Sequence, residues 1–334
     1  MDKTLIIAEA GINHNGSLGQ AIKLCDAARK ARADIVKFQT FRTECNVLKD
    51  CDWVKYQKEN APDFKSHWEM LKALELDDDE FRELKAYCDK TGIGFLSTPS
   101  DQPSLELLLS MGVGSFKISS GDVANIPLLR KIGRLNKIIW LSTGMSTMEE
   151  VGVALKTLTQ AGTSKEKITL LHCHSDYPTK IEDANLSAML ALRDAFGTKV
   201  GFSDHTLGTE AAIAAVALGA SVIEKHLTLD RNMAGPDQKS SLEPEIFASM
   251  VKAVRNIEKA MGDGVKRITP KEQEIRRVYG KGIVAARDIA KGEIFTEDKL
   301  AAKRPNRGIA VSEWDMIVGR TAKNNFKKDD FIKL

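Results

Sequence analysis

The chain has 334 residues, which is enough for a complete barrel and a small second domain. Apolar residues make up 43% and charged residues 28% of it, as in ordinary globular proteins, and the formal net charge is only +3. Because Lys and Arg are spread along the chain, no basic tract indicates binding to nucleic acid or to a membrane surface. No apolar run approaches the roughly 18 residues of a membrane span, and we expect no signal peptide.

Eight short apolar segments predict β-strands, and most are separated by segments with helical spacing. Strands that alternate with helices pair in parallel through right-handed crossovers, so the sequence predicts a (β/α)8 barrel. A doubly wound sheet is the alternative, but it would require a G-x-G-x-x-G turn after the first strand. Residues 11–16 read Gly-Ile-Asn-His-Asn-Gly and do not match that pattern. The predicted strands are Leu5–Gly11, Ile35–Phe41, Gly94–Pro99, Ser115–Gly121, Lys137–Gly144, Ile168–Ser175, Val200–Thr206 and Ser221–Leu229.

Three further stretches complete the predicted organisation. The connection of residues 42–93 is long for a compact domain, and such loops are often functional lids. We expect it to be irregular over 43–65 and helical over 67–90. The barrel would occupy residues 1–262, a polar linker residues 263–281, and a small, mostly β module residues 282–334. Because so small a module has a marginal core, we expect it to dock on another surface.

Five cysteines occur, at positions 25, 45, 51, 88 and 173. Their number is odd and no two form a C-x-x-C pair, so a disulfide framework or a zinc ribbon is not expected. The sequence instead predicts a reduced, cytoplasmic enzyme.

His205 and His226 close two consecutive predicted strands, and the segment between them is rich in Ala. In a β/α barrel the carboxyl ends of the strands converge on the face that carries the active site. Two imidazoles there either form hydrogen bonds in a packed barrel or hold a divalent metal. Polar partners at the neighbouring strand ends favour the metal.

Every other predicted strand also ends in polar residues, which is costly in a buried sheet unless they are paired or bound. Lys37 and Lys117, with nearby hydroxyl groups, suit an anion, most simply a phosphate. A lysine could instead form a Schiff base. No G-x-x-x-x-G-K-[ST] loop is present, so nucleotide hydrolysis is not expected. The polar strand ends are Glu9; Lys37 and Gln39; Ser97 and Thr98; Lys117, Ser119, Ser120 and Asp122; Ser142 and Thr143; His172, His174 and Ser175; Ser203, Asp204 and His205; and Glu224 and His226.

Eight ordered motifs along nearly the whole chain resemble the sialic acid synthases, and the C-terminal module, with Lys303-Arg-Pro305, resembles their antifreeze-like (SAF) domain. The motifs include Ile7 to Gly16, Val36 to Thr40, Phe95 to Pro99, Phe116 to Asp122, Leu141 to Met145, Leu171 to Cys173 with Tyr177-Pro178, Ser203 to Thr206, and Glu224 to His226 with Gly235-Pro-Asp237.

The resemblance implies an enzyme that condenses phosphoenolpyruvate with an N-acetylated hexosamine to a nine-carbon 2-keto acid and phosphate. The acceptor would be N-acetylmannosamine, giving N-acetylneuraminate, or a 2,4-diacetamido-2,4,6-trideoxyhexose, giving legionaminate or pseudaminate. The resemblance further implies a homodimer whose swapped C-terminal domain covers the partner's active site. Other phosphoenolpyruvate-condensing barrels are the nearest rival, and a non-catalytic sugar-binding protein with a relic barrel is a rival of another class.

The same resemblance implies residue roles. His205 and His226 would bind Mn2+, Mg2+ or Co2+, and Lys37 and Lys117 would stabilise charge, with Asp122 or Glu9 moving protons. Asp122 stands where relatives often have Glu, and Ser175 lies in a stretch that differs from some members, although it would still bind phosphate or carboxylate. Phosphoenolpyruvate would be held by Lys37, Thr98, Lys117, Ser120, Ser142, Ser175 and Ser203, and the sugar by Gln39, Tyr177, Asp237 and Arg304.

Overall fold

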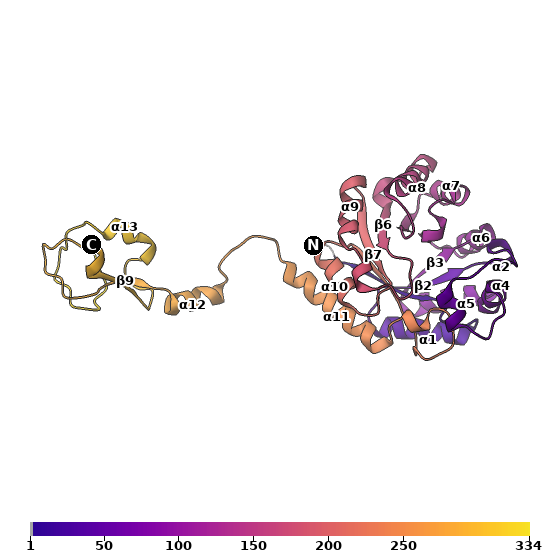
Figure 1. Cartoon of the computed structure of the whole chain (residues 1–334), viewed down its shortest axis with the longest axis horizontal. Helices are drawn as coiled ribbons and strands as arrows, with labels where there is room; N and C mark the ends of the chain where they lie inside the picture. The colour runs from indigo at the N-terminus through magenta and orange to yellow at the C-terminus, as the bar shows by residue number, and fades with distance from the viewer. Residues whose placement is uncertain (1–2) are drawn as a thin grey trace. The chain divides into compact units, whose positions relative to one another are not determined.

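The computed structural model describes residues 3–334 and divides the chain into two compact units, Met1–Asp263 and Gly264–Leu334 (Figure 1). The first unit is built on one parallel sheet in the order β3-β2-β1-β8-β7-β6-β5-β4. Within the described residues, β3 and β4 lie against each other without a hydrogen-bonded ladder, so the barrel is nearly closed. The predicted (β/α)8 fold is thus confirmed. The strands are β1 Leu5–Gly11, β2 Ile35–Thr40, β3 Gly94–Pro99, β4 Ser115–Ile118, β5 Ile138–Ser142, β6 Ile168–Cys173, β7 Lys199–Asp204 and β8 Val222–His226.

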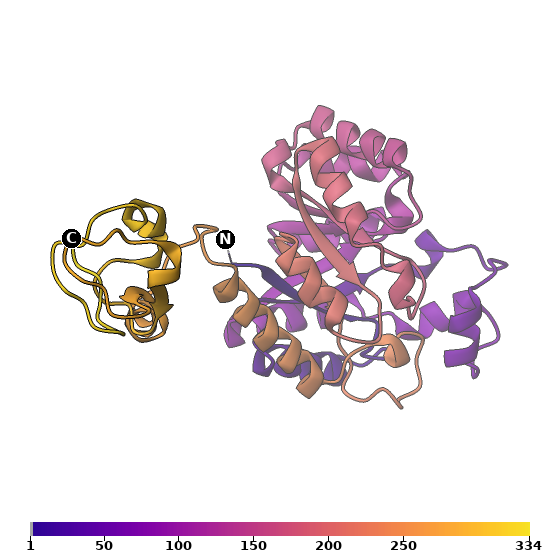
Figure 2. The same ribbon diagram turned by 60° about the vertical axis from the view of Figure 1, so that its left-hand side comes forward.

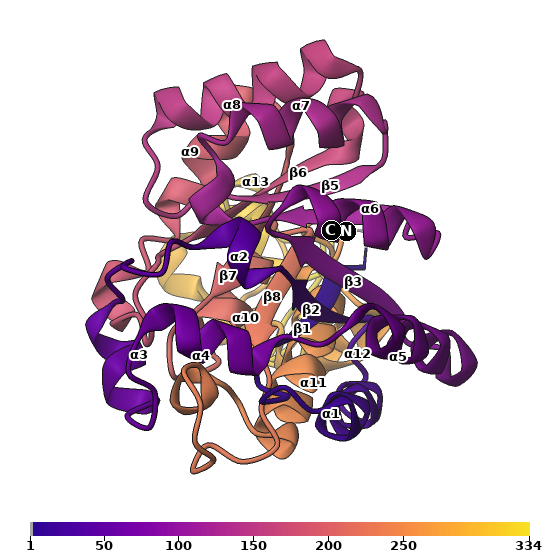
Figure 3. The same cartoon turned by 90° about the vertical axis from the view of Figure 1, so that its right-hand side faces the viewer.

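Helices surround these strands (Figure 3). Capping residues fix where several of them begin: the Ser17 side chain accepts a hydrogen bond from the Gln20 backbone N–H, and Asp77 and Glu80 form a capping box. Helices α10 and α11 pack against each other on the barrel (Figure 2). The helices of this unit are α1 Leu18–Lys30, α2 Thr43–Asn46, α3 Lys55–Asn60, α4 His67–Leu74, α5 Asp78–Thr91, α6 Gln102–Ser110, α7 Ile126–Arg134, α8 Met148–Ala161, α9 Ser187–Phe196, α10 Glu210–Ala217 and α11 Pro244–Met261.

The elements differ from the predictions mainly at their ends. Several predicted strands run one to three residues too far, because the polar residues after β4 to β8 leave the ladder to form turns, and His205 lies one residue beyond β7. The sequence did not indicate α7. The predicted helical part of the long connection is two helices, α4 and α5, separated at 75–77, and the predicted irregular part contains α2 and α3.

Two apolar clusters determine where the polar strand ends lie. The main core lies between the strands and the outer helices. Inside the barrel, a second cluster contains Ile7, Leu96, Trp140, Leu171 and Val222. Because side chains alternate along a strand, the residue two positions after each of these also points into the barrel. It lies nearer the carboxyl end of its strand. Those residues are Glu9, Thr98, Ser142, Cys173 and Glu224.

The connection between β2 and β3 carries a small apolar cluster of its own. Ile12 and Phe41 from the barrel pack there with Ala61, Met70, Leu71 and Leu74, and Val47, Trp53 and Phe64 lie against them. We call residues 42–76, which include α2, α3 and α4, the lid. The cluster gives this long segment a defined structure rather than leaving it as an open loop.

The second unit has its own buried core, including Ile283, Phe295, Leu300, Ile317 and Ile332. It contains α12 Pro270–Tyr279, the antiparallel strands β9 Gly282–Ala285 and β10 Leu300–Lys303, and α13 Trp314–Ile317. Helix α12 lies in the predicted linker, where Thr269 and Glu272 form a capping box. Across the described residues 3–334, no helix has the length and apolar character needed to span a membrane.

Candidate active site

The polar strand ends meet because the parallel strands are paired in register. Glu9 of β1 is opposite both Lys37 of β2 and His226 of β8, Gln39 of β2 is opposite Thr98 of β3, and Ser203 of β7 is opposite Glu224 of β8. Lys117 comes from β4 on the other side of the barrel. Residues separated by more than 200 positions therefore share one interior face.

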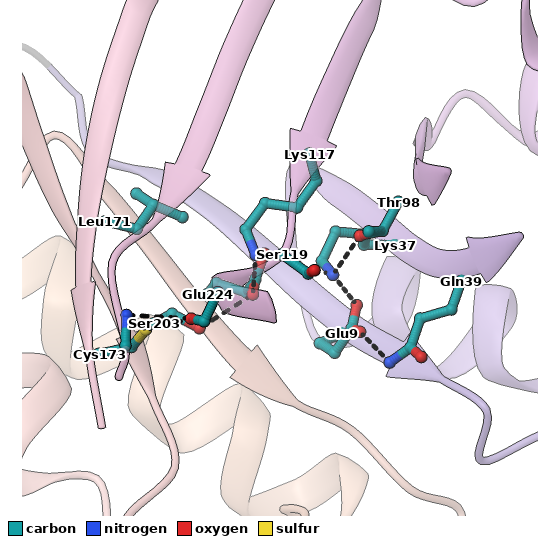
Figure 4. A network of polar contacts seen from close by, with 12 residues as sticks. Glu9, Lys37, Gln39, Thr98, Lys117, Ser119, Leu171, Cys173, Ser203 and Glu224 are labelled. Atoms are coloured by element: carbon teal, nitrogen blue, oxygen red, sulfur yellow. Dashed lines mark hydrogen bonds and ion pairs between the residues drawn. The ribbon is translucent and has the colours of Figure 1, made fainter. Parts of the chain in front are cut away.

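Four buried charges form a chain across this interior (Figure 4). Lys37 Nζ lies 2.8 Å from Glu9 Oε2 and 3.6 Å from Glu224 Oε2, and Lys117 Nζ lies 3.2 Å from Glu224 Oε1. Each of the four side chains is at most 5% exposed. Two lysines and two glutamates balance to a net charge of zero, which makes their burial tolerable.

Hydroxyl and amide groups complete this network (Figure 4). Ser203 Oγ donates to Glu224 Oε1 at 2.9 Å, Gln39 Nε2 donates to Glu9 Oε1 at 3.2 Å, and Lys37 Nζ donates to Thr98 Oγ1 at 3.3 Å. Each carboxylate therefore has a fixed orientation before any ligand binds.

The environment shifts the pKa of each charged group. Burial alone would raise the pKa of Glu224, but Lys117, Lys37 and the Ser203 hydroxyl lower it to about 2. Burial would lower the pKa of Lys37, but Glu224 and Glu9 outweigh it and raise the pKa. Burial lowers the pKa of Lys117, and Lys37 adds to this effect. Burial, with the nearby Glu224 charge, raises the pKa of Glu9.

A second polar group surrounds Gly144, directly after β5. The Gly144 N–H donates to Ser120 Oγ at 3.0 Å and to Cys173 Sγ at 3.2 Å. A Cβ on Gly144 would lie only 2.3 Å from Ser175 Oγ, so the absence of a side chain lets these hydroxyls approach the backbone. The nearby Ser142 hydroxyl is buried without a partner among the described residues. Converging N–H and O–H groups of this kind suit an anion.

The two histidines lie near one another, with ring centroids 5.4 Å apart, and His205 is held beside the segment that carries Cys173 and Ser175. His205 Nδ1 lies 2.6 Å from the His174 carbonyl oxygen, which assigns its proton to Nδ1, and the unprotonated Nε2 lies 3.4 Å from Ser203 Oγ. His226 Nδ1 is buried and has no partner among the described residues. Burial lowers the pKa of His205 to about 4 and that of His226 below its ordinary range, so both are neutral near pH 7.

These properties fit metal ligands, because neutral imidazoles with an unprotonated ring nitrogen bind divalent metals. Within residues 3–334, however, no three His, Cys, Asp or Glu side chains are arranged as a metal cluster. A metal held here would take the remaining ligands from water or substrate.

Aromatic rings cover the histidines. The Tyr177 ring lies against His205 at a tilt of 31°, with centroids 4.1 Å apart, and meets His226 edge-on at 5.6 Å. Tyr56 from the lid stacks on Tyr177 at 5.3 Å. Asp237, in the loop after β8, is buried, and burial with the nearby Glu9 charge raises its pKa to about 7.

Two further predicted site residues have contacts within their own segments of the chain. The Asp122 carboxylate accepts hydrogen bonds from Ser119 Oγ at 2.6 Å and Asn125 Nδ2 at 3.0 Å, so it holds the turn after β4. Arg304 belongs to the second unit, where its guanidinium lies over the Tyr279 ring, 4.5 Å from the centroid.

Three residues of the site were given no role by the sequence. Glu224 was recognisable as a strand-end carboxylate on the same face as His226, but nothing showed that it joins both lysines. Cys173 was considered only as one of five free cysteines, and its Sγ lies 3.2 Å from Ser120 Oγ. Tyr56 lies in the stretch predicted to be irregular, and no sequence signal pointed to it.

The barrel, the charge network at its carboxyl face and the adjoining group of hydroxyls define a (β/α)8 enzyme that acts on an anionic substrate. Residues 24–266 match the model of the NeuB family, and residues 280–334 match the SAF domain. The chain belongs to the NeuB family. The predicted resemblance and the prediction that the protein is a synthase are therefore confirmed.

Named relatives cover nearly the whole chain. It is 46% identical over 333 residues to the N,N'-diacetyllegionaminic acid synthase of Campylobacter jejuni, covering 100% of both chains. It is 42% identical to the enzyme of that name from Legionella pneumophila, covering 94% of this chain and 89% of the other. The crystal structure of N-acetylneuraminic acid synthetase from Leptospira borgpetersenii, in complex with citrate, is 35% identical, with a TM-score of 0.71, and covers 82% of this chain and 90% of the other.

Proposed function

We propose that the protein condenses phosphoenolpyruvate with the open-chain aldehyde of an N-acetylated hexosamine. C3 of phosphoenolpyruvate forms a bond to the aldehyde carbon, and water adds its oxygen to C2. The C2–O bond to phosphate then breaks, giving a nine-carbon 2-keto acid. Of the two protons of water, one reaches the former aldehyde oxygen and the other leaves with hydrogen phosphate.

The observation that carries this proposal is the buried pair of lysines beside the hydroxyls around Gly144. Phosphoenolpyruvate has a carboxylate and a phosphate, and the two sets of donors match two anionic groups on one small molecule. We assign the carboxylate to Lys37 and Thr98, and the phosphate to Lys117, Ser142 and the donors around Gly144. Fixed cations there would stabilise charge as it develops during the reaction.

Proton transfer is assigned to Glu9 rather than to Asp122. Glu9 is buried beside Lys37 and Gln39, and its raised pKa suits a group that accepts and returns a proton. The Asp122 carboxylate is occupied by Ser119 and Asn125, so its proposed task is to hold the turn that carries Ser120.

His205 and His226 would hold Mn2+, Mg2+ or Co2+, which supplies a Lewis acid for the aldehyde oxygen. Gln39, Tyr177 and Asp237 would contact the acceptor sugar. The names of two similar relatives favour a 2,4-diacetamido-2,4,6-trideoxyhexose as acceptor, and N-acetylmannosamine is the second candidate.

We also propose a homodimer in which the second unit of one copy supplies Arg304 to the sugar site of the other. Helix α12 supports this, because Ile275, Val278 and Tyr279 are 48%, 62% and 61% exposed and leave an apolar surface. Mixing inactive Lys117→Met and Arg304→Ala variants tests it. Mixed dimers would have one intact site and regain activity, whereas a site made within one chain would regain none.

Phosphate release from phosphoenolpyruvate labelled with 18O at the bridging position tests the reaction itself. With Mn2+ and the correct hexosamine, the label should appear in phosphate, since the C–O bond breaks. Label retained in the keto acid would contradict the mechanism. Lys117→Met should abolish release, whereas Lys252→Met, an exposed lysine of α11, should not change it.

The cytoplasmic location is also proposed, and agrees with five cysteines that are all free.

A further inference from the structure

Tyr56 joins the lid to the rings that cover the histidines. It lies on α3, near the middle of the lid, and stacks on Tyr177 with an interplanar angle of 26°. Tyr177 in turn lies against His205, with the two rings tilted by 31°. The three rings form a column that leads from the lid to the predicted metal ligands. Tyr56 is half-buried although the lid around it is largely exposed.

Hydrogen bonds fix this column against the loop that carries Asp237. The Gly235 N–H donates to the Asn60 carbonyl oxygen at 3.4 Å, and Asn60 Nδ2 donates to the Pro236 carbonyl oxygen at 3.0 Å. Asn60 ends the helix that carries Tyr56. From the β1 side, Asn15 Nδ2 donates to the Ala234 carbonyl oxygen at 2.7 Å. The ring of Tyr56 and the carboxylate of Asp237 are thus held on linked backbone segments.

The apolar cluster of the lid also fixes the position of α3, the helix that carries Tyr56. Ala61, directly after α3, is buried in it with Met70 and Leu74 of α4. The position of Tyr56 therefore depends on packing within the lid and on the Asn60 contacts, and not on the barrel ladders. A substitution at Tyr56 itself removes only the ring and leaves these anchors in place.

We propose that Tyr56 is a specificity-determining residue of the acceptor pocket. Its ring and that of Tyr177 form an apolar wall that favours an acceptor bearing acetyl and methyl groups over one bearing hydroxyls at the same carbons. This inference rests on the proposed function and adds the residue that selects among acceptors. It assigns the preference for a diacetamido-trideoxy sugar over N-acetylmannosamine to the lid.

The physical reason is a difference in desolvation. A methyl group gains when it leaves water for an aromatic face, whereas a hydroxyl placed there loses a hydrogen bond with water and gains none. Discrimination by one apolar contact is on the order of ten- to a hundredfold in kcat/KM. Asp237 provides the polar side of the same pocket, so an acceptor would be oriented with its hydroxyls toward Asp237 and its methyls toward Tyr56.

The test compares kcat/KM for 2,4-diacetamido-2,4,6-trideoxymannose and for N-acetylmannosamine in four proteins. The wild type should prefer the diacetamido sugar. Tyr56→Ala should reduce that preference about tenfold or more, with the KM for phosphoenolpyruvate unchanged within about twofold. Tyr56→Phe keeps the ring and should keep the preference. Trp68→Ala is the matched control, because it removes a large ring of the lid that lies against Lys49 and not against Tyr177.

Each other result has a distinct meaning. A wild type that turns over no hexosamine contradicts the proposed function, whatever the variants do. A wild type that is active but prefers N-acetylmannosamine, or a Tyr56→Ala variant that loses both sugars equally, overturns the inference alone. If Tyr56→Phe behaves like Tyr56→Ala, the phenol hydroxyl and not the ring is responsible, and the apolar wall is wrong. A loss of preference in Trp68→Ala would also overturn it.

Discussion

The ammonium nitrogen of Lys117 lies 3.2 Å from Oε1 of Glu224, and both side chains are buried. Glu224 also reaches Lys37, so this one carboxylate joins the two cations that the sequence assigned to phosphoenolpyruvate. An arriving anion must therefore share the lysines with a partner that is already present. Glu224 therefore holds the two ammonium groups in place and compensates their charge until the substrate binds.

Replacing Glu224 by Gln should destabilise the protein and make it more sensitive to anions. Removing one partner of a buried ion pair costs about 3–5 kcal/mol, which urea unfolding would measure. Added phosphate should recover more stability in Glu224→Gln than in the wild type, because it supplies the missing negative charge. Asp288→Asn, which breaks the exposed pair with Lys327, is the control and should change the stability little, because solvent screens exposed ion pairs. If phosphate stabilised the wild type as much as Glu224→Gln, the assignment of the two lysines to an anion would be contradicted.

Mn2+ should raise the melting temperature through His205 and His226. At a hundredfold excess over Kd, a ligand stabilises by about 2.7 kcal/mol, which corresponds to roughly 5–10 °C. EDTA should reverse the shift, and His226→Ala should abolish it. His172→Gln should keep it, because the His172 ring lies against the Ala184 carbonyl oxygen and not at the site. A full shift in His226→Ala would place the metal elsewhere.

Asp237 should make stability depend on pH. Its pKa is about 7 in the folded chain, above its ordinary value of 3.8, so the folded chain keeps a proton that the unfolded chain releases. Stability from this group is therefore present below about pH 4 and is lost as the pH rises to about 7, at up to about 1.4 kcal/mol per pH unit. Asp237→Asn should flatten the change in urea midpoint between pH 5 and pH 7, while the exposed Asp63→Asn should leave the slope as it is. An unchanged slope in Asp237→Asn would show that the carboxyl titrates normally.

Gly144→Ala should damage binding of phosphoenolpyruvate. The added Cβ would displace the Ser175 and Ser120 hydroxyls, which lie 2.3 and 2.8 Å from its position. We expect the KM for phosphoenolpyruvate to rise about tenfold or more, since one charge-assisted hydrogen bond is worth about 1.5–3 kcal/mol. Gly114→Ala is the control, because its Cβ would meet nothing within 4 Å. A normal KM in Gly144→Ala would remove this group of hydroxyls from the substrate site.

The sequence predicted those parts of the molecule that depend on local pattern. Strand and helix alternation fixed the barrel, and polar residues at strand ends identified most of the site, because parallel strands in register bring their carboxyl ends together. Glu224 shows where this reasoning stops. Its position on β8 was readable, but its contact with Lys117 crosses the barrel from β4, and no local pattern encodes that distance.

Tyr56 shows a second limit. The lid has no strong periodicity, and its order comes from packing against Ile12 and Phe41 and from hydrogen bonds to the loop after β8. Asp122 shows a third, since its role beside Ser119 and Asn125 depends on the turn that forms after β4. These contacts are tertiary, so sequence spacing alone does not contain them.

The separate apolar cluster of the lid makes one wall of the proposed acceptor pocket exchangeable, the wall that carries Tyr56. Within the described residues 3–334, Ile12 and Phe41 are the only barrel residues in that cluster, and the four buried charges of the network come wholly from strands. A chimaera that takes residues 42–76 from a family member with another acceptor would thus change sugar preference while its handling of phosphoenolpyruvate stayed the same. Through duplication and drift of this one segment, a lineage could come to use new acceptor sugars without rebuilding its catalyst.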